Sequence, residues 1–192
     1  MIAILTAPVL LTIILLILSQ FSTDYAPNIV SERNKTQLII TGVLTGLLGG
    51  GLFEEIGWTG FATPELRKKH DVVYTGLFIG FFWGLWHLLP VYWGSGDIEG
   101  KIDWTLFLPG LFTHYAILVP YRVLIVWIHD HTRSLIPAIL MHASLTTFIL
   151  FLLSISPSGL PLFIYYICIA TGLWIMVWII HRKSKNTYQK MK

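Results

Sequence analysis

The chain has 192 residues, of which 55% are hydrophobic and only 12% are charged, and its mean hydropathy is +0.70. Soluble domains carry about 25% charged residues, so this composition excludes an ordinary soluble protein and indicates a membrane protein. The net charge of +3 comes mainly from short basic clusters at the ends of apolar segments. This distribution excludes a nucleic-acid-binding patch, and we expect no nucleic-acid partner.

Six apolar segments are long enough to cross a bilayer, which requires about 20 residues each. They are residues 2–21, 37–61, 73–93, 104–128, 134–154 and 160–181. We therefore predict an all-α fold, a polytopic membrane helix bundle of about six transmembrane helices. The bundle is expected to form a single domain over 1–192, with its motif-bearing core at 37–154. No basic residues precede the first segment and no cleavage site is evident near its end, so we expect a retained helix and not a signal peptide.

Basic residues gather at the ends of alternate segments. They are Arg67, Lys68, Lys69 and Arg133, followed by a basic tail at 182–192, whereas the opposite loops carry Arg33, Lys35 and Lys101. By the positive-inside rule, both termini are expected to face the cytoplasm of a multi-pass protein of the cell membrane. The tail is expected to lie against anionic lipid headgroups.

Glycine recurs at every fourth position in the second and third segments. The first stripe is Gly42, Gly46 and Gly50 and leads to Glu54; the second is Gly76, Gly80 and Gly84 and leads to His87. Small residues at this spacing let membrane helices approach closely. We predict that the two stripes pack together and bring Glu54 near His87. Generic helix packing, without a role for the polar residues, is the alternative.

A short helix is expected directly after the second segment. Thr63-Pro64-Glu65 has the pattern of a helix start, with a capping residue, a proline and then an acid. We expect this helix to run through the basic cluster at the membrane interface. Loops are predicted at 94–97 and 156–159, where glycine, serine and proline gather.

Four polar residues inside the apolar segments are candidates for chemistry: Glu54, Glu55, His87 and His142. Ionisable groups in hydrocarbon cost several kcal/mol and are usually functional. Adjacent carboxylates repel each other, and a carboxylate that exchanges a proton can act as a general base. One shared polar cavity would satisfy all four residues. His114, in the fourth segment, is expected to be an ordinary helix contact.

Depth along the helices favours one pairing within this set. A rise of about 1.5 Å per residue puts Glu54 about 12 Å from a cytoplasmic edge at residue 62, and His142 about 13 Å from Arg133. His87 would lie about 21 Å from residue 73. This estimate favours a meeting of Glu54 with His142 over one with His87.

The candidate residues fall within three ordered motifs. Residues 54–61 read EEIGWTGF, residues 83–90 read WGLWHLLP, and residues 134–144 read SLIPAILMHAS. In this order they resemble the motifs of the CPBP intramembrane proteases, which include the CAAX prenyl endopeptidases and the bacterial Abi proteins. The resemblance covers residues 54–146, about half of the chain.

The resemblance implies an intramembrane endopeptidase. Glu54 would be the general base that activates water, His87 would hold that water, and His142 would stabilise the oxyanion. Glu55 would shape the site and balance its charge. The substrate would be a peptide or a membrane protein, with or without a prenyl group. No cofactor is expected, and a zinc ion bound by Glu54, His87 and His142 is the alternative.

The chain departs from the family pattern at three positions. Thr59 stands where the first motif normally has arginine, Thr146 stands where the third often has asparagine, and Trp83 stands where phenylalanine is common. The missing arginine leaves Glu55 without its usual partner, and a buried unpaired carboxylate is costly. We predict that Arg122, in the fourth segment, points inward and pairs with Glu55. The alternative is an arginine at the lipid headgroups.

These departures leave other functions open. A catalytically impaired family member could act as a membrane immunity or scaffold protein. A small proton-coupled transporter that uses Glu54 and Glu55 as a relay is a weaker alternative, because six helices without a repeat differ from common transporter designs.

Overall fold

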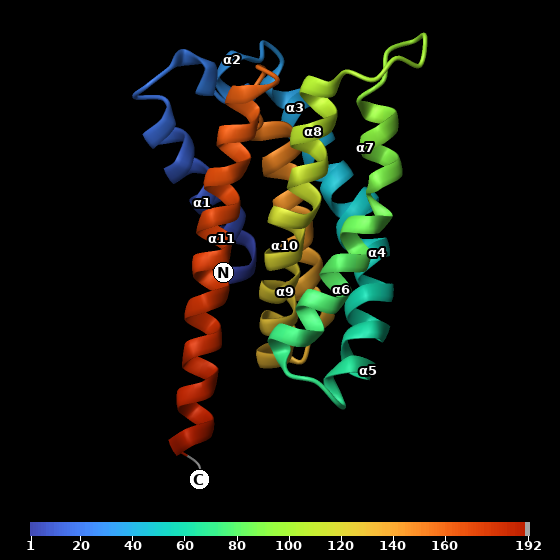
Figure 1. Cartoon of the computed structure of the whole chain (residues 1–192), viewed down its shortest axis with the longest axis vertical. Coiled ribbons are helices and arrows are strands. Elements are labelled where there is room, and N and C mark those ends of the chain that lie inside the picture. The colour runs from blue at the N-terminus through green and yellow to red at the C-terminus, as the bar shows by residue number, and fades with distance from the viewer. Residues whose placement is uncertain (191–192) are drawn as a thin grey trace.

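The computed structural model describes residues 1–190, with side chains described through residue 182. In this part of the chain all regular elements are helical, which confirms the all-α fold (Figure 1). Five helices are long and apolar enough to cross a membrane: Lys35–Arg67, Val72–Gly94, Trp104–Thr132, Leu135–Leu152 and Leu160–Arg182. A sixth apolar helix, α1 (Ile2–Leu18), is shorter at 17 residues. Beyond residue 182, the predicted basic tail lies outside the residues whose side chains are described.

The second span is one continuous helix of 33 residues with two π-helical turns in it. Its parts are α3 (Lys35–Leu44), η2 (Thr45–Leu52), α4 (Phe53–Gly57), η3 (Trp58–Ala62) and α5 (Thr63–Arg67). The short helix expected after residue 62 is therefore the end of this helix. Thr63 does not cap it, because its hydroxyl donates to the Trp58 carbonyl, 2.8 Å away. The π turns η2 and η3 flank the two glutamates, and such turns often occur at functional sites.

The third span is interrupted at His87. Helix α6 (Val72–Trp86) starts at Asp71, whose carboxylate accepts a hydrogen bond from the Tyr74 N–H at 2.7 Å. It ends at His87, and α7 (Leu88–Gly94) follows. Proline at position 90 has no N–H to donate to the Trp86 carbonyl, which accounts for the break.

The other spans complete the bundle around a buried central helix. They are α8 (Trp104–Thr113), η4 (His114–Leu118), α9 (Val119–Thr132), α10 (Leu135–Thr147), η5 (Phe148–Leu152) and α11 (Leu160–Lys190). The short elements η1 (Thr23–Tyr25) and α2 (Asn28–Ser31) join α1 to α3. Every residue from 119 to 126 on α9 is buried. In Figure 1, α9 and α10 run between α11 on one side and α4 and α6 on the other.

The two glycine stripes do not face each other, so the predicted stripe-to-stripe packing is wrong. A Cβ atom at Gly76 would lie 2.5 Å from Val123 Cα, so the stripe on α6 packs against α9. A Cβ atom at Gly46 would lie 2.5 Å from the Ala143 carbonyl oxygen, so the other stripe packs against α10. Each stripe therefore brings its helix close to a different central helix, and the site forms between them.

Several basic residues lie at the end of the bundle that is lowest in Figure 1, where α5 ends and α9 meets α10. Arg67 on α5 forms a two-point ion pair with Asp130 on α9, with Nη2–Oδ2 and Nε–Oδ1 distances of 3.0 and 3.1 Å. Arg133 ends α9 in a left-handed conformation, with φ of 53°. Helix α11 also runs to this end, whereas residue 1 lies about midway along the bundle.

Candidate active site

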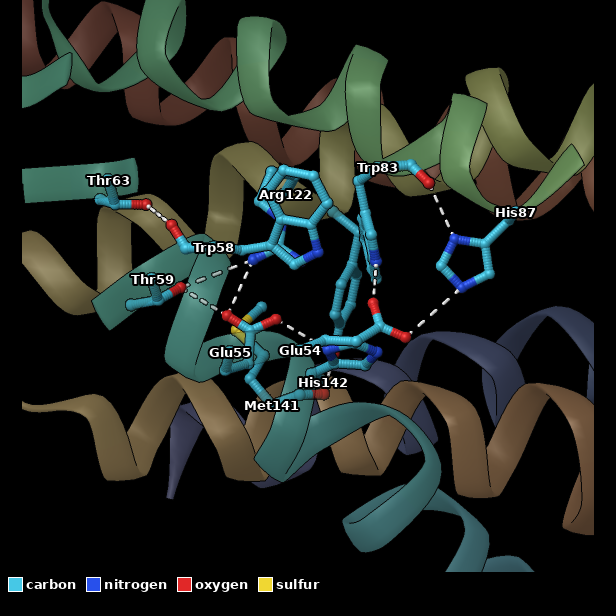
Figure 2. A network of polar contacts seen from close by, with 11 residues as sticks. Glu54, Glu55, Trp58, Thr59, Thr63, Trp83, His87, Arg122, Met141 and His142 are labelled. Atoms are coloured by element: carbon cyan, nitrogen blue, oxygen red, sulfur yellow. Dashed lines mark hydrogen bonds and ion pairs between the residues drawn. The ribbon is translucent and has the colours of Figure 1, made fainter. Parts of the chain in front are cut away.

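Glu55 lies at the centre of a buried polar network and is fully shielded from solvent (Figure 2). Its Oε2 atom lies 2.8 Å from Arg122 Nη1 and also accepts a hydrogen bond from the Thr59 hydroxyl. Its Oε1 atom accepts a hydrogen bond from His142 Nδ1 at 2.7 Å. The predicted Arg122–Glu55 ion pair is present, and the alternative position of Arg122 at the headgroups is wrong.

Arg122 lies on a different helix from Thr59, the position at which the first motif normally has arginine. It lies on α9, and its guanidinium carbon is 4.1 Å from the centroid of the Trp83 ring, a cation–π contact. Gly80 on α6 lies against the base of this side chain, since a Cβ there would be 3.2 Å from Arg122 Cβ. Arg122 Nε and Nη2 have no hydrogen-bond partner among the described residues. Its charge is thus balanced by Glu55 and by the indole face.

Glu54 occupies a separate, partly exposed position beside His87. Its Oε2 accepts a hydrogen bond from Trp83 Nε1 at 2.7 Å, and its Oε1 lies 3.8 Å from His87 Nε2. His87 Nδ1 lies 2.8 Å from the Trp83 carbonyl oxygen. A carbonyl oxygen only accepts hydrogen bonds, so Nδ1 carries a proton, and Nε2 is the ring nitrogen that faces Glu54.

The pairing expected from depth is therefore wrong, since His142 meets Glu55 and His87 meets Glu54. The helix boundary used for Glu54 was also wrong, because the second helix continues to Arg67 and does not stop at residue 62. Counted from Arg67, Glu54 is about 20 Å along its helix, and His87 is about 22 Å from the start of α6. The two residues then lie at the same height.

Trp83 contacts four members of the network and is 1% exposed. In addition to its contacts with Glu54 and Arg122, its ring meets His87 edge-on, with centroids 5.6 Å apart, and His142 with centroids 4.9 Å apart. The sequence suggested only an aromatic replacement for phenylalanine. Its indole N–H, which phenylalanine lacks, is the hydrogen-bond donor to Glu54.

The structure leaves one predicted residue outside the network and brings in another. The Thr146 hydroxyl makes no hydrogen bond within the described residues, whereas the hydroxyl of its neighbour Thr147 donates to the Gly42 carbonyl at 3.0 Å. His114 on η4 is 8% exposed, and its ring centroid lies 5.6 Å from that of His87. Its position within an apolar segment, which it shares with His87 and His142, was the available signal.

The zinc alternative, with Glu54, His87 and His142 as ligands, stays a prediction. Over the described residues, no group of three His, Cys, Asp or Glu side chains is arranged to hold a metal ion. The Nε2 atom of His142 faces Gly50, where a Cβ would lie 2.7 Å away, whereas His87 Nε2 faces Glu54.

The network has a buried part and a reachable part. The Glu55 and Arg122 side chains are 0% exposed, whereas those of Glu54 and His87 are 16% and 25% exposed. Their sequence neighbours Phe53 and Trp86 are exposed apolar side chains on the flank of the bundle. At this edge, a carboxylate oxygen and an imidazole nitrogen are close enough to contact the same water molecule.

Comparison with known proteins identifies the family. The profile of the type II CAAX prenyl endopeptidase Rce1-like family matches residues 36–148, which is more than half of the chain. CAAX prenyl protease 2 of Methanococcus maripaludis is 30% identical over 123 residues, covering 64% of this chain and 39% of that protein. The chain therefore spans less than half of the length of that relative. No solved structure matches. The chain belongs to the type II CAAX prenyl endopeptidase Rce1-like family.

Proposed function

We propose that this chain is an intramembrane endopeptidase in which Glu54 and His87 activate a water molecule for hydrolysis of a peptide bond. The observation that carries this proposal is the 3.8 Å gap between Glu54 Oε1 and His87 Nε2. One water oxygen about 2.8 Å from each atom could donate a hydrogen bond to both. Its lone pairs would then be free to attack a carbonyl carbon.

The remaining residues support this chemistry. The water oxygen bonds to the peptide carbonyl carbon while Glu54 takes one water proton, and that proton goes to the amine nitrogen as the C–N bond breaks. His142 would donate from Nε2 to the carbonyl oxygen as it becomes negative. The Glu55 carboxylate accepts the hydrogen bond from Nδ1 of the same ring and fixes the orientation of the ring. A single such donor is worth about 10²- to 10³-fold in rate.

The substrate is proposed to be a peptide or a membrane protein that enters from the membrane or its cytoplasmic edge. Glu54 and His87 are partly exposed, next to the apolar side chains of Phe53 and Trp86. A prenylated tail is one such substrate, as the name CAAX prenyl protease 2 indicates for the Methanococcus maripaludis relative. We place the basic end of the bundle, with Arg67 and Arg133, in the cytoplasm.

We further propose that the reaction needs no metal. Hydrogen bonds within the protein orient both histidine rings of the site, that of His87 through the Trp83 carbonyl and that of His142 through Glu55. A metal ion is therefore not needed to fix the rings. Glu54 then acts directly on water. This mechanism requires only a carboxylate base, a water-holding imidazole and a donor for the oxyanion.

A non-catalytic immunity or scaffold role is the second candidate. The observation in its favour is that Thr146, where the family often has asparagine, adds no hydrogen bond to the described network. Against it, Arg122 supplies a cation to Glu55 at 2.8 Å, so the other departure from the motif is compensated. The charge balance of the site is therefore retained.

One experiment separates these candidates. The full chain in liposomes is tested for cleavage of a quenched peptide library, together with Glu54→Gln and His87→Asn variants. Glu54→Gln keeps the hydrogen bond from Trp83 but cannot take a proton, so we expect a loss of about 10²- to 10⁴-fold. His131→Asn, on an exposed histidine, is the control. The proposal would be refuted if Glu54→Gln cleaved at the wild-type rate. It would also be refuted if no folded form of the protein, wild type included, cleaved any peptide.

A further inference from the structure

Tyr121 on α9 is a buried tyrosine whose hydroxyl group reaches the backbone of α10. The residue is 0% exposed, and its hydroxyl donates a hydrogen bond to the Met141 carbonyl oxygen at 2.8 Å. A carbonyl oxygen has two lone pairs, so it can accept this bond in addition to one from its own helix. Met141 directly precedes His142 and lies beside His142 and Glu55 in Figure 2. The bond therefore joins α9 to α10 at the residue next to a histidine of the proposed site.

This bond completes a closed set of contacts across three helices. Arg122, the next residue on α9, pairs with Glu55 Oε2 at 2.8 Å. On its other oxygen, Glu55 accepts the hydrogen bond from His142 Nδ1 at 2.7 Å. The chain itself links Tyr121 to Arg122 and Met141 to His142. Two neighbouring residues of one buried helix thus hold both partners of the Glu55–His142 hydrogen bond.

We propose that Tyr121 is a positioning residue for the reaction, because it sets the place of the His142 ring against Glu55; this inference rests on the proposed function. In that function, His142 donates from Nε2 to the carbonyl oxygen as it becomes negative, and such a donor is effective only where the oxyanion forms. A misplacement of about 1 Å can cost about 10²-fold in rate. Tyr121 acts through the height and rotation of α10, which carries His142, and not on the substrate itself.

A second buried tyrosine makes the same kind of bond outside the network around Glu55. Tyr165 on α11 is 0% exposed, and its hydroxyl donates to the Leu153 carbonyl oxygen at 2.8 Å. Leu153 follows η5, beyond the end of α10. The burial and the bond length of the two tyrosines are alike, so removing either hydroxyl takes away the same kind of hydrogen bond. Removing that of Tyr121 also releases the backbone next to His142.

The first test compares Tyr121→Phe with Tyr165→Phe in the full chain in liposomes, with the quenched peptide that the wild type cleaves best. We expect Tyr121→Phe to lower kcat about tenfold with KM nearly unchanged, because the oxyanion donor acts in the transition state. Tyr165→Phe should match the wild type in both constants. A wild-type kcat in Tyr121→Phe, or an equal fall in the two variants, would overturn the inference and leave the protease proposal intact.

The second test reports on the ring of His142 without any cleavage. In proton NMR of the protein in micelles, labelled with nitrogen-15 histidine, the Nδ1 proton held by Glu55 should give a downfield signal that His142→Asn removes. Tyr121→Phe should shift this signal upfield, and Tyr165→Phe should leave it in place.

The outcomes of the second test separate the two proposals. An unshifted signal in Tyr121→Phe would overturn the positioning role. Failure of Tyr121→Phe to fold where Tyr165→Phe folds would also overturn it, because the bond would then serve the bundle as a whole. A shifted signal in a protein whose wild type cleaves no peptide would support the positioning of His142 and refute the proposed function.

Discussion

Replacing Arg122 with methionine tests whether the buried ion pair holds the site together. Methionine keeps an unbranched apolar side chain at this position but removes the cation above the Trp83 ring and leaves the Glu55 carboxylate buried without its partner. Removing one partner of a buried pair costs about 3–5 kcal/mol. Thr59 and His142 still donate to Glu55, so we expect a loss near the lower bound, about 3 kcal/mol in the free energy of unfolding.

The assay is denaturant unfolding in mixed micelles, followed by circular dichroism. The control is Lys68→Met, which removes the partner of Glu65 in an exposed pair whose side chains are 64% and 53% exposed. Such pairs contribute about 0–1 kcal/mol. If Arg122→Met unfolds at the same denaturant concentration as Lys68→Met, the buried charge is not what stabilises this region, and the reasoning is refuted.

A double variant separates lost charge from lost packing. Glu55→Gln combined with Arg122→Met leaves no charge in the pair, so we expect it to be more stable than Arg122→Met alone. The coupling between the two changes should exceed about 2 kcal/mol, within the range for residues in direct contact. If the losses of stability in the two single variants simply added up in the double variant, the ion pair would not be the source of the destabilisation.

Three further predictions concern other contacts. Trp83→Phe removes the N–H that orients Glu54, so kcat should fall about tenfold or more while KM stays similar. Trp104→Phe, at an exposed position away from the site, is the control, and equal rates in the two variants would count against this role of Trp83. Gly46→Ala places a Cβ 2.5 Å from the Ala143 carbonyl and should cost about 1–3 kcal/mol of stability. Gly57→Ala meets nothing within 4 Å and should be neutral or stabilising, so similar losses in both would argue against the close packing of η2 on α10. Treatment with a strong chelator should leave the cleavage rate unchanged; a loss that zinc restores would refute the metal-free mechanism.

Much of the architecture follows from local properties of the sequence. The apolar segments predicted the spanning helices, because a bilayer-length run of apolar residues is costly to expose to water. The cost of an unpaired buried carboxylate also predicted the partner of Glu55. Thr59 could not supply a charge, and Arg122 was the cation inside a nearby span.

The sequence by itself thus determined which segments are buried, which polar residues need partners, and which charge balances Glu55. Only the tertiary structure decided that His87 faces Glu54, that His142 faces Glu55, that Trp83 joins the two pairs, and that His114 lies against His87. Helical periodicity sets which side chains share a face of one helix. It does not set the rotation or height of one helix against the next, and those depend on packing between residues far apart in the chain.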